Sequence, residues 1–174
     1  MSTAKTLILG GVRSGKSRLA ERLAADTGRP VTCIATATAG DPEMAARIAA
    51  HRARRPRGWR VIEEPIRLAQ ALDEARGDCV IVDCLTLWLT NLLGSEDPGL
   101  LRRERTALLE ILPRLPGPVC LVSNETGLGL VAANPLGRRF CDEAGRLHQD
   151  LAALCDRVVL TVAGLPLVMK GEPL

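Results

Sequence analysis

An unusual concentration of positive charge surrounds one of the two histidines of this 174-residue chain. Six arginines fall within residues 47–60, no acidic residue lies between Glu43 and Glu63, and His51 is inside this cluster. A neutral imidazole can attack phosphorus and form a P–N bond, and neighbouring guanidinium groups both disfavour the imidazolium and neutralise phosphate charge. The segment is therefore either a histidine nucleophile held against a triphosphate or a solvated basic helix face, and periodicity alone does not decide between them.

A second group of residues has the spacing of a phosphate-binding loop. The sequence GGVRSGKS fits the pattern G-x-x-x-x-G-K-[ST], with an apolar strand pattern before it and an amphipathic helix pattern after it. In such a loop the backbone N–H groups face the phosphates, the lysine reaches the β- and γ-phosphates, and the hydroxyl of the last residue binds magnesium. The predicted nucleotide contacts are Gly10, Gly11, Val12, Arg13, Ser14, Gly15, Lys16 and Ser17.

The sequence CVIVDC contains one acidic residue at the end of an apolar run. Four apolar residues precede Asp83, which places its side chain at the carboxyl end of a predicted buried strand. Acids in this position of P-loop proteins hold magnesium, often through water. The alternative is that Asp83 only caps the helix predicted to begin at residue 85.

Alternating strand and helix patterns position these residues. Short apolar runs predict strands at 6–10, 31–36, 79–83, 119–124 and 157–164, and amphipathic patterns predict helices at 16–26, 42–54, 65–76, 85–93, 99–112 and 134–154. Asp41 and Pro42 are a predicted N-cap and first-turn proline. Strands that are apolar on both faces indicate a mostly parallel sheet covered by helices on both sides. The prediction is one α/β domain over 1–174, of the doubly wound P-loop NTPase type.

Composition narrows the class of partner. The net charge is +3, so the six clustered arginines leave −3 for the rest of the chain, and only 2% of residues are aromatic. This argues against a nucleic-acid partner, because binding nucleic acid needs a basic surface and stacking side chains.

No apolar run approaches the roughly 20 residues of a membrane span. A strand pattern begins by Thr6, which leaves no room for a signal peptide, and the six cysteines contain no C-x-x-C pair. We therefore expect free cysteines and a cytoplasmic location.

Several of these segments together resemble one family. The sequences GGVRSGKS, DPEMAARI, HRARRP, LTLWLTNLL and SNETGLGLV, in this order between Gly10 and about Leu151, are similar to those of bifunctional adenosylcobinamide kinase/adenosylcobinamide-phosphate guanylyltransferases of cobalamin biosynthesis. The resemblance implies a RecA-like sheet, a homotrimer, and two reactions with magnesium. The first reaction phosphorylates adenosylcobinamide from ATP or GTP. In the second, GMP passes from GTP through a histidine to that phosphate, giving adenosylcobinamide-GDP.

The resemblance also implies roles for particular residues. The guanylylated histidine corresponds to His51. Beyond the P-loop, the implied nucleotide contacts are Ile34, Ala35, Thr36, Arg52, Ala53, Arg54, Arg55, Glu63 and Asp83. Because one P-loop must serve attack on two different phosphorus atoms, we hypothesise that segment 54–60 is a hinge that lets the histidine helix approach only with GTP bound.

The substrate side is less defined. Asn124 and Glu125 end a predicted strand at the edge where ligands bind, and the glycine-rich stretch after them suits a loop over a bulky corrinoid. Glu125 is either the base for the substrate hydroxyl or part of a structural polar pair. His148 occupies a position where other members carry asparagine, and we interpret it as a helix-surface or satisfied polar residue, with corrinoid contact as the alternative.

Two other functions are compatible with a P-loop. A plain small-molecule kinase would use the arginine helix only to bind phosphates, and it would keep full turnover without His51. A non-catalytic RecA-like nucleotide-binding module would bind single-stranded nucleic acid with a strong salt dependence.

Overall fold

A seven-stranded sheet forms the centre of the computed structural model, which describes residues 4–40, 42–54, 56 and 58–174. The strand order is β3-β2-β4-β5-β1-β6-β7. All neighbouring strands are parallel except β6 and β7, which form an antiparallel hairpin. The strands are β1 (Lys5–Gly10), β2 (Val31–Ala35), β3 (Arg60–Glu63), β4 (Cys79–Asp83), β5 (Val119–Asn124), β6 (Arg157–Val162) and β7 (Leu165–Lys170).

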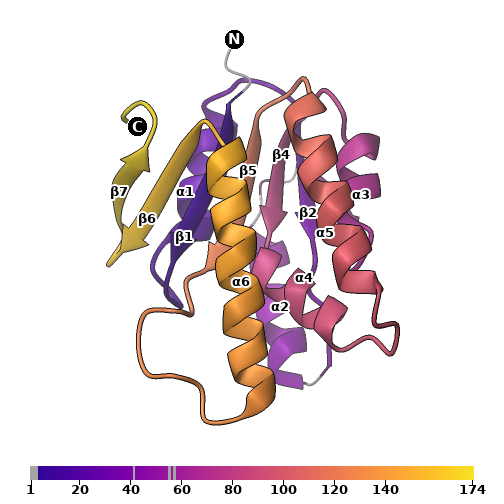
Figure 1. Cartoon of the computed structure of the whole chain (residues 1–174). Coiled ribbons are helices and arrows are strands. Elements are labelled where there is room, and N and C mark those ends of the chain that lie inside the picture. The colour runs from indigo at the N-terminus through magenta and orange to yellow at the C-terminus, as the bar shows by residue number, and fades with distance from the viewer. Residues whose placement is uncertain (1–3, 41, 55, 57) are drawn as a thin grey trace.

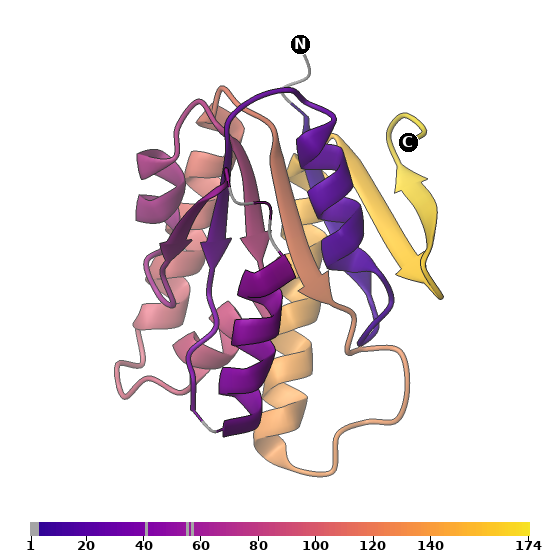
Figure 2. The ribbon, with the colours of Figure 1, turned by 180° about the vertical axis from the view of Figure 1, so that it is seen from behind.

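Helices cover both faces of this sheet. Figures 1 and 2 show α1 and α2 on one side and α3 to α6 on the other. The helices are α1 (Lys16–Ala25), α2 (Pro42–Arg54), α3 (Leu68–Glu74), α4 (Leu85–Leu93), α5 (Leu100–Ile111), the short 3-10 helix η1 (Leu112–Arg114) and α6 (Pro135–Leu154). The predicted α/β architecture is confirmed, and no described helix is long and apolar enough to cross a bilayer.

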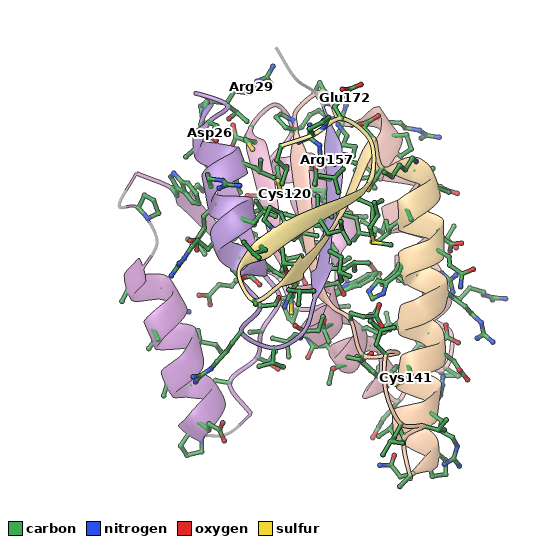
Figure 3. All side chains as sticks on the ribbon, turned by 90° about the vertical axis from the view of Figure 1, so that its left-hand side faces the viewer. Asp26, Arg29, Cys120, Cys141, Arg157 and Glu172 are labelled. Atoms are coloured by element: carbon green, nitrogen blue, oxygen red, sulfur yellow. The ribbon has the colours of Figure 1, made fainter. Side chains whose placement is uncertain are left out.

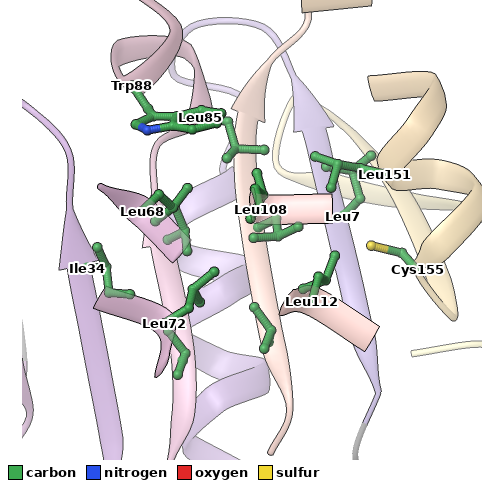
Figure 4. Close-up of a cluster of buried hydrophobic side chains, with 14 of the residues drawn as sticks. Leu7, Ile34, Leu68, Leu72, Leu85, Trp88, Leu108, Leu112, Leu151 and Cys155 are labelled. Carbon is green, nitrogen blue, oxygen red and sulfur yellow. The ribbon is translucent and has the colours of Figure 1, made fainter. Parts of the chain in front are cut away.

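Successive residues of each central strand pack into different cores because side chains alternate across a sheet. Leu7 of β1 lies in the core under α3 to α6, whereas its neighbour Ile8 lies in the core under α1. Figure 4 shows the first of these cores, in which Trp88 is fully buried. Its Nε1 donates to the carbonyl oxygen of Ile66, 2.7 Å away. Burial on both faces explains why these strands appear in the sequence as continuous apolar runs.

The structure corrects the predicted elements at three places. Strands β3 and β7 were absent from the prediction, which placed one helix over 65–76 directly after the basic segment. That helix is shorter, Leu68–Glu74, because Oε1 of Glu64 accepts from the backbone N–H groups of Ile66 and Arg67 and forms a turn before it. The last predicted strand, 157–164, ends at Val162, where the turn to β7 begins.

The carboxyl ends of the parallel strands meet at one edge of the sheet. Register pairs place Ala35 beside both Glu63 and Asp83, and Gly10 beside Asn124. Figure 3 shows α2 and the N-terminal half of α6 extending past this edge on opposite sides. Most of the residues that carry the predicted chemistry therefore come from this single edge and the elements around it.

Candidate active site

The loop between β1 and α1 has the backbone conformation of a phosphate cradle. Gly10 and Gly15 have φ values of 153° and 101°, and a Cβ at Gly10 would lie 2.5 Å from the carbonyl oxygen of Thr161. Gly15 directly precedes the first residue of α1, so the free N–H groups of that helix face the loop. Gly11, Val12 and Arg13 are exposed. The loop thus offers backbone donors and a helix N-terminus to an anion.

A hairpin far away in the sequence supports this loop from behind. Ser14 Oγ and Thr161 Oγ1 are 2.8 Å apart, and Thr161 Oγ1 donates to the carbonyl of Leu9, 3.1 Å away. The turn between β6 and β7 contributes the backbone N–H of Gly164, which donates to the carbonyl of Ser14 over 3.0 Å. Sequence reasoning missed Thr161 and Gly164 because their contacts to the loop span about 150 positions and depend on sheet order.

Lys16 lies inside the cradle with its charge partly desolvated. Its side chain is buried, and Nζ donates to the carbonyl of Gly11 over 2.6 Å. Desolvation lowers the pKa of Lys16, and the charges of Cys84 and Asp83 act in the opposite direction. An ammonium held in such a place is a strong electrostatic partner for phosphate, since little water screens it.

Asp83 ends β4 at the edge that carries the cradle. Strand β5 lies between β4 and β1, so Asp83 and the P-loop are two strand spacings apart, about 10 Å between backbones. Cys84, the residue after Asp83, occupies the N-cap position of α4 and makes no side-chain capping bond. Ser17 is half-buried and follows Lys16 in the first turn of α1. The magnesium roles of Asp83 and Ser17 stay predictions.

Thr36 fixes the backbone of Cys84, the residue directly after Asp83. Thr36 is fully buried. Its Oγ1 donates to the carbonyl of Cys84 (2.6 Å) and accepts from the N–H of Cys84 (3.0 Å). The carbonyl of Thr36 accepts from Nδ2 of Asn91 over 2.8 Å. Its polar groups are thus used within the fold, and its nucleotide contact stays a prediction. Ile34 is buried and Ala35 half-buried beside it.

Replacing Thr36 with valine should destabilise the fold at this point. The change keeps the shape but leaves the buried N–H of Cys84 without its hydroxyl partner, whereas the carbonyl of Cys84 still accepts from the N–H of Trp88. An unpaired buried donor costs about 1–3 kcal/mol. Urea unfolding followed by circular dichroism measures the effect. Thr36→Ser, which keeps the hydroxyl, is the matched control, and equal losses in both variants would contradict this role.

Helix α2 carries the basic cluster with the predicted bounds. Arg52 and Ala53 are exposed on it, and Arg52 forms an ion pair with Glu63 at the carboxyl end of β3. Both partners are largely solvent-exposed, so the pair contributes little stability, but it places this face of α2 next to the sheet edge. The side chains of His51 and Arg54, and Asp41 and Arg55 as a whole, lie outside the described residues.

Glu125 is tied to the first glycine of the P-loop. Its backbone N–H donates to the carbonyl of Gly10 over 3.0 Å, and its Oε1 accepts from the N–H of Gly127 over 2.5 Å. Asn124, at the end of β5, donates its backbone N–H to Oγ1 of Thr86, 2.7 Å away. Both residues are half-buried at the same edge as the cradle. The structure therefore brings the substrate-side candidates and the P-loop together.

His148 is a buried, hydrogen-bonded residue and does not lie on the helix surface. Only 8% of the residue is exposed, and its Nε2 lies 2.8 Å from Oγ of Ser123. Burial lowers the pKa of His148, and the nearby charge of Glu125 acts against this shift. Of the two expected roles, the satisfied polar residue is therefore correct and the surface position is wrong.

The lowered pKa of His148 predicts a loss of stability in acid. The unfolded chain binds the proton at the ordinary pKa of about 6.5, while the folded chain binds it only at lower pH. Below pH 6.5 the unfolded state therefore holds more protons, and the free energy of unfolding falls until the folded pKa is reached. Urea midpoints of the wild type and His148→Asn between pH 7.5 and 5 test this. The stability advantage of the wild type over the variant should shrink as pH falls, and a constant difference would contradict the assignment.

The sequence matches one protein family over most of its length. The family model described as "Cobinamide kinase / cobinamide phosphate guanyltransferase" matches residues 6–169. The bifunctional adenosylcobalamin biosynthesis protein CobP of Pseudomonas aeruginosa is 63% identical over 172 residues, which cover 98% of this chain and 99% of that protein. The bifunctional adenosylcobalamin biosynthesis protein CobU of Escherichia coli is 40% identical and covers 94% of this chain and 98% of the relative.

Solved structures support the fold. The flagellar accessory protein FlaH from Methanocaldococcus jannaschii superposes with a TM-score of 0.56 at 14% identity, covering 98% of this chain and 79% of FlaH. The protein PH0250 from Pyrococcus horikoshii gives 0.55 at 9% identity, with coverages of 98% and 88%. These likenesses show that the overall fold is shared and nothing about the reaction.

Proposed function

The chain belongs to the cobinamide kinase/cobinamide phosphate guanyltransferase family, and from this premise we propose that it catalyses both reactions in that name. It phosphorylates adenosylcobinamide and then attaches GMP to the new phosphate. The observation that carries the proposal is that one family model spans the P-loop, α2 and the Glu125 segment in a single chain, residues 6–169. The geometry of the sheet edge is consistent with it, because the P-loop, Asp83 and Glu125 meet there.

In the first reaction the substrate hydroxyl attacks the γ-phosphorus of ATP or GTP. An O–P bond forms, the bond between the γ-phosphorus and the bridging oxygen breaks, and the nucleoside diphosphate leaves. The N–H groups of Gly11 to Ser17 and the ammonium of Lys16 hold the phosphates and stabilise the charge that develops. Glu125, held beside Gly10, receives the proton of the hydroxyl.

In the second reaction an imidazole nitrogen of His51 attacks the α-phosphorus of GTP. A P–N bond forms and pyrophosphate leaves. A phosphate oxygen of the corrinoid then attacks the same phosphorus, the P–N bond breaks, and adenosylcobinamide-GDP is released. Arg52, Arg54 and Arg55 follow His51 within four positions of the sequence. In the proposal their positive charges disfavour the imidazolium form and balance the charge of the phosphates. The hinge at 54–60 stays the hypothesis for how α2 changes its approach.

Magnesium fits the oxygen ligands at this edge. Ser17 and Asp83 supply one hydroxyl and one carboxylate, and magnesium usually binds one or two protein oxygens together with substrate phosphates and water. Within the described residues no group of three or more histidine, cysteine or acidic side chains is arranged to hold a metal ion. In the proposal the bound nucleotide completes the coordination. When bound, the ion neutralises charge on the phosphates. The remaining nucleotide contacts in the proposal are Ile34, Ala35, Thr36, Ala53 and Glu63.

The proposal also includes location and assembly. The six cysteines are free thiols and five are buried, which suits a reducing cytoplasm. We place residues 1–174 in a single domain because all seven described strands belong to one sheet. The homotrimer is proposed from the family resemblance, and light scattering of the purified protein tests it.

Product analysis tests the function directly. Incubation with adenosylcobinamide, magnesium and ATP should yield the corrinoid phosphate, and addition of GTP should convert it to adenosylcobinamide-GDP with release of pyrophosphate. Chromatography with mass detection separates the three corrinoids. Nucleotide hydrolysis without any change in the corrinoid would contradict the proposal.

A further inference from the structure

A chain of buried polar side chains lies behind Glu125 and connects three elements. His148 of α6 contacts Oγ of Ser123 on β5 through its Nε2, at 2.8 Å. Oγ of Ser123 lies 3.3 Å from Oγ1 of Thr86 on α4, and Thr86 accepts the N–H of Asn124. The opposite ring nitrogen, Nδ1 of His148, lies 3.9 Å from Oε2 of Glu125. None of these side chains except Glu125 has a role in the reactions described above.

The chemistry of Glu125 and His148 indicates which atom donates and which accepts at each contact of this group of side chains. A buried imidazole with a lowered pKa is neutral at pH 7 and carries one N–H. A carboxylate only accepts, so the tautomer that suits Glu125 has its hydrogen on Nδ1. Nε2 then accepts the hydroxyl hydrogen of Ser123, and Ser123 accepts that of Thr86. Each hydroxyl donates once, and the arrangement selects the Nδ1–H tautomer facing Glu125.

Glu125 is held in such a way that one oxygen faces this N–H. Its Oε1 accepts from the N–H of Gly127, and its backbone is bonded to Gly10 at the start of the P-loop. Oε2 is the oxygen that faces Nδ1 of His148. The side chain of Glu125 is 22% exposed, so it is accessible from the sheet edge, whereas Ser123 is only 2% exposed. The side chains of Ser123, His148 and Glu125 lie next to one another in space in this order, but the burial of Ser123 excludes it as a nucleophile.

We propose that His148 is a positioning residue for Glu125 in the phosphorylation step. Its Nδ1–H directs Oε2 of Glu125 towards the substrate hydroxyl, whose proton Oε2 receives. The distance of 3.9 Å is longer than a hydrogen bond, and we expect it to shorten when substrate is bound, as catalytic contacts commonly do. The inference rests on the proposed kinase function and names no new reaction.

Two substitutions at His148 separate its two ring nitrogens. The amide of asparagine reaches about as far as Nδ1 and keeps a donor towards Glu125, while the amide of glutamine reaches as far as Nε2 and keeps the contact to Ser123. His148→Asn should keep the kcat of phosphorylation within about threefold of the wild type. His148→Gln should lower kcat by about tenfold or more, with the KM for ATP unchanged, because positioned proton transfer supplies roughly 10²–10⁴ in rate.

A second background distinguishes positioning from folding. In a Glu125→Gln background, His148→Gln should have almost no further effect on kcat, because both changes act on one proton transfer. Covalent labelling of the protein by α-labelled GTP should be unchanged in both His148 variants, which shows that the nucleotide site is intact.

The outcomes decide between the claims. Equal kcat values for the asparagine and glutamine variants would overturn the positioning role. Additive losses in the Glu125→Gln background would overturn it as well. A wild type that labels with GTP but never phosphorylates adenosylcobinamide would contradict the proposed kinase function itself.

Discussion

Replacing His51 with alanine should abolish GMP transfer while the kinase step continues. The variant lacks the only nucleophile proposed to attack the α-phosphorus, so formation of adenosylcobinamide-GDP should fall by at least about 10³-fold, as is typical when a covalent nucleophile is removed. Phosphorylation of adenosylcobinamide uses the P-loop and Glu125 and should stay within about threefold of the wild type. Both products are measured in one reaction by chromatography after addition of ATP and then GTP.

A neighbouring exposed position of the same helix provides the control. Ala49→Ser alters the same helix two residues away from His51 at an exposed position, and it removes no proposed chemical group. This variant should keep both activities. A His51→Ala variant that still makes adenosylcobinamide-GDP would leave the arginine helix as a phosphate clamp, and loss of both steps would mean that His51 serves the fold.

Replacing Lys16 with methionine should remove both activities and raise stability. The ammonium of Lys16 is partly desolvated and its pKa is lowered, which means that the charged form is less favourable in the folded chain than in the unfolded one. At neutral pH the methionine variant avoids that cost. Without the charge on the phosphates, we expect turnover of each step to fall by about 10²–10³-fold. The melting temperature should rise by about 2–4 °C for each kcal/mol of desolvation that is relieved.

The same substitution at Lys170 is the matched control. Nζ of Lys170 donates to the carbonyl groups of Ala152, Ala153 and Cys155 at the end of α6. Lys170→Met therefore removes the partner of these terminal carbonyls and should lower the melting temperature without changing the activities. Thermal unfolding of the nucleotide-free proteins compares the two variants. A Lys16→Met protein that is less stable than the wild type would contradict the desolvation argument.

The central strands and the histidine helix were predictable because their patterns are long and unambiguous. The predicted bounds of β4, β5 and α2 agree with the structure, since buried parallel strands appear as continuous apolar runs and Pro42 marks a helix start. The two missed strands are both at edges of the sheet. β3 has only four residues, most of them exposed, and β7 contains Pro166 and five exposed positions. β3 is too short and too polar to appear as an apolar run, and Pro166 argues against a strand in the otherwise apolar sequence LPLVMK.

The residues of the P-loop were predictable, and the residues that support them were not. The spacing of Gly10, Gly15 and Lys16 indicates the cradle from the sequence alone. The contact between Ser14 and Thr161 joins positions 147 apart, and it exists only because β6 pairs with β1. The burial of His148 is a similar case, because only the packing of α6 on β5 turns that helix position towards Ser123. Local sequence patterns contain no signal for such pairings.

The most direct test of the account uses GTP labelled at either the α- or the γ-phosphate. The purified protein is incubated with magnesium and each label, denatured, and examined for attached label before and after separate acid and alkali treatments. The account predicts that only the α-label is retained, that the bond is labile in acid and stable in alkali, and that the labelled peptide contains His51. No retained label, or retention of the γ-label, would contradict a guanylyl-histidine intermediate and leave a kinase as the function of this chain.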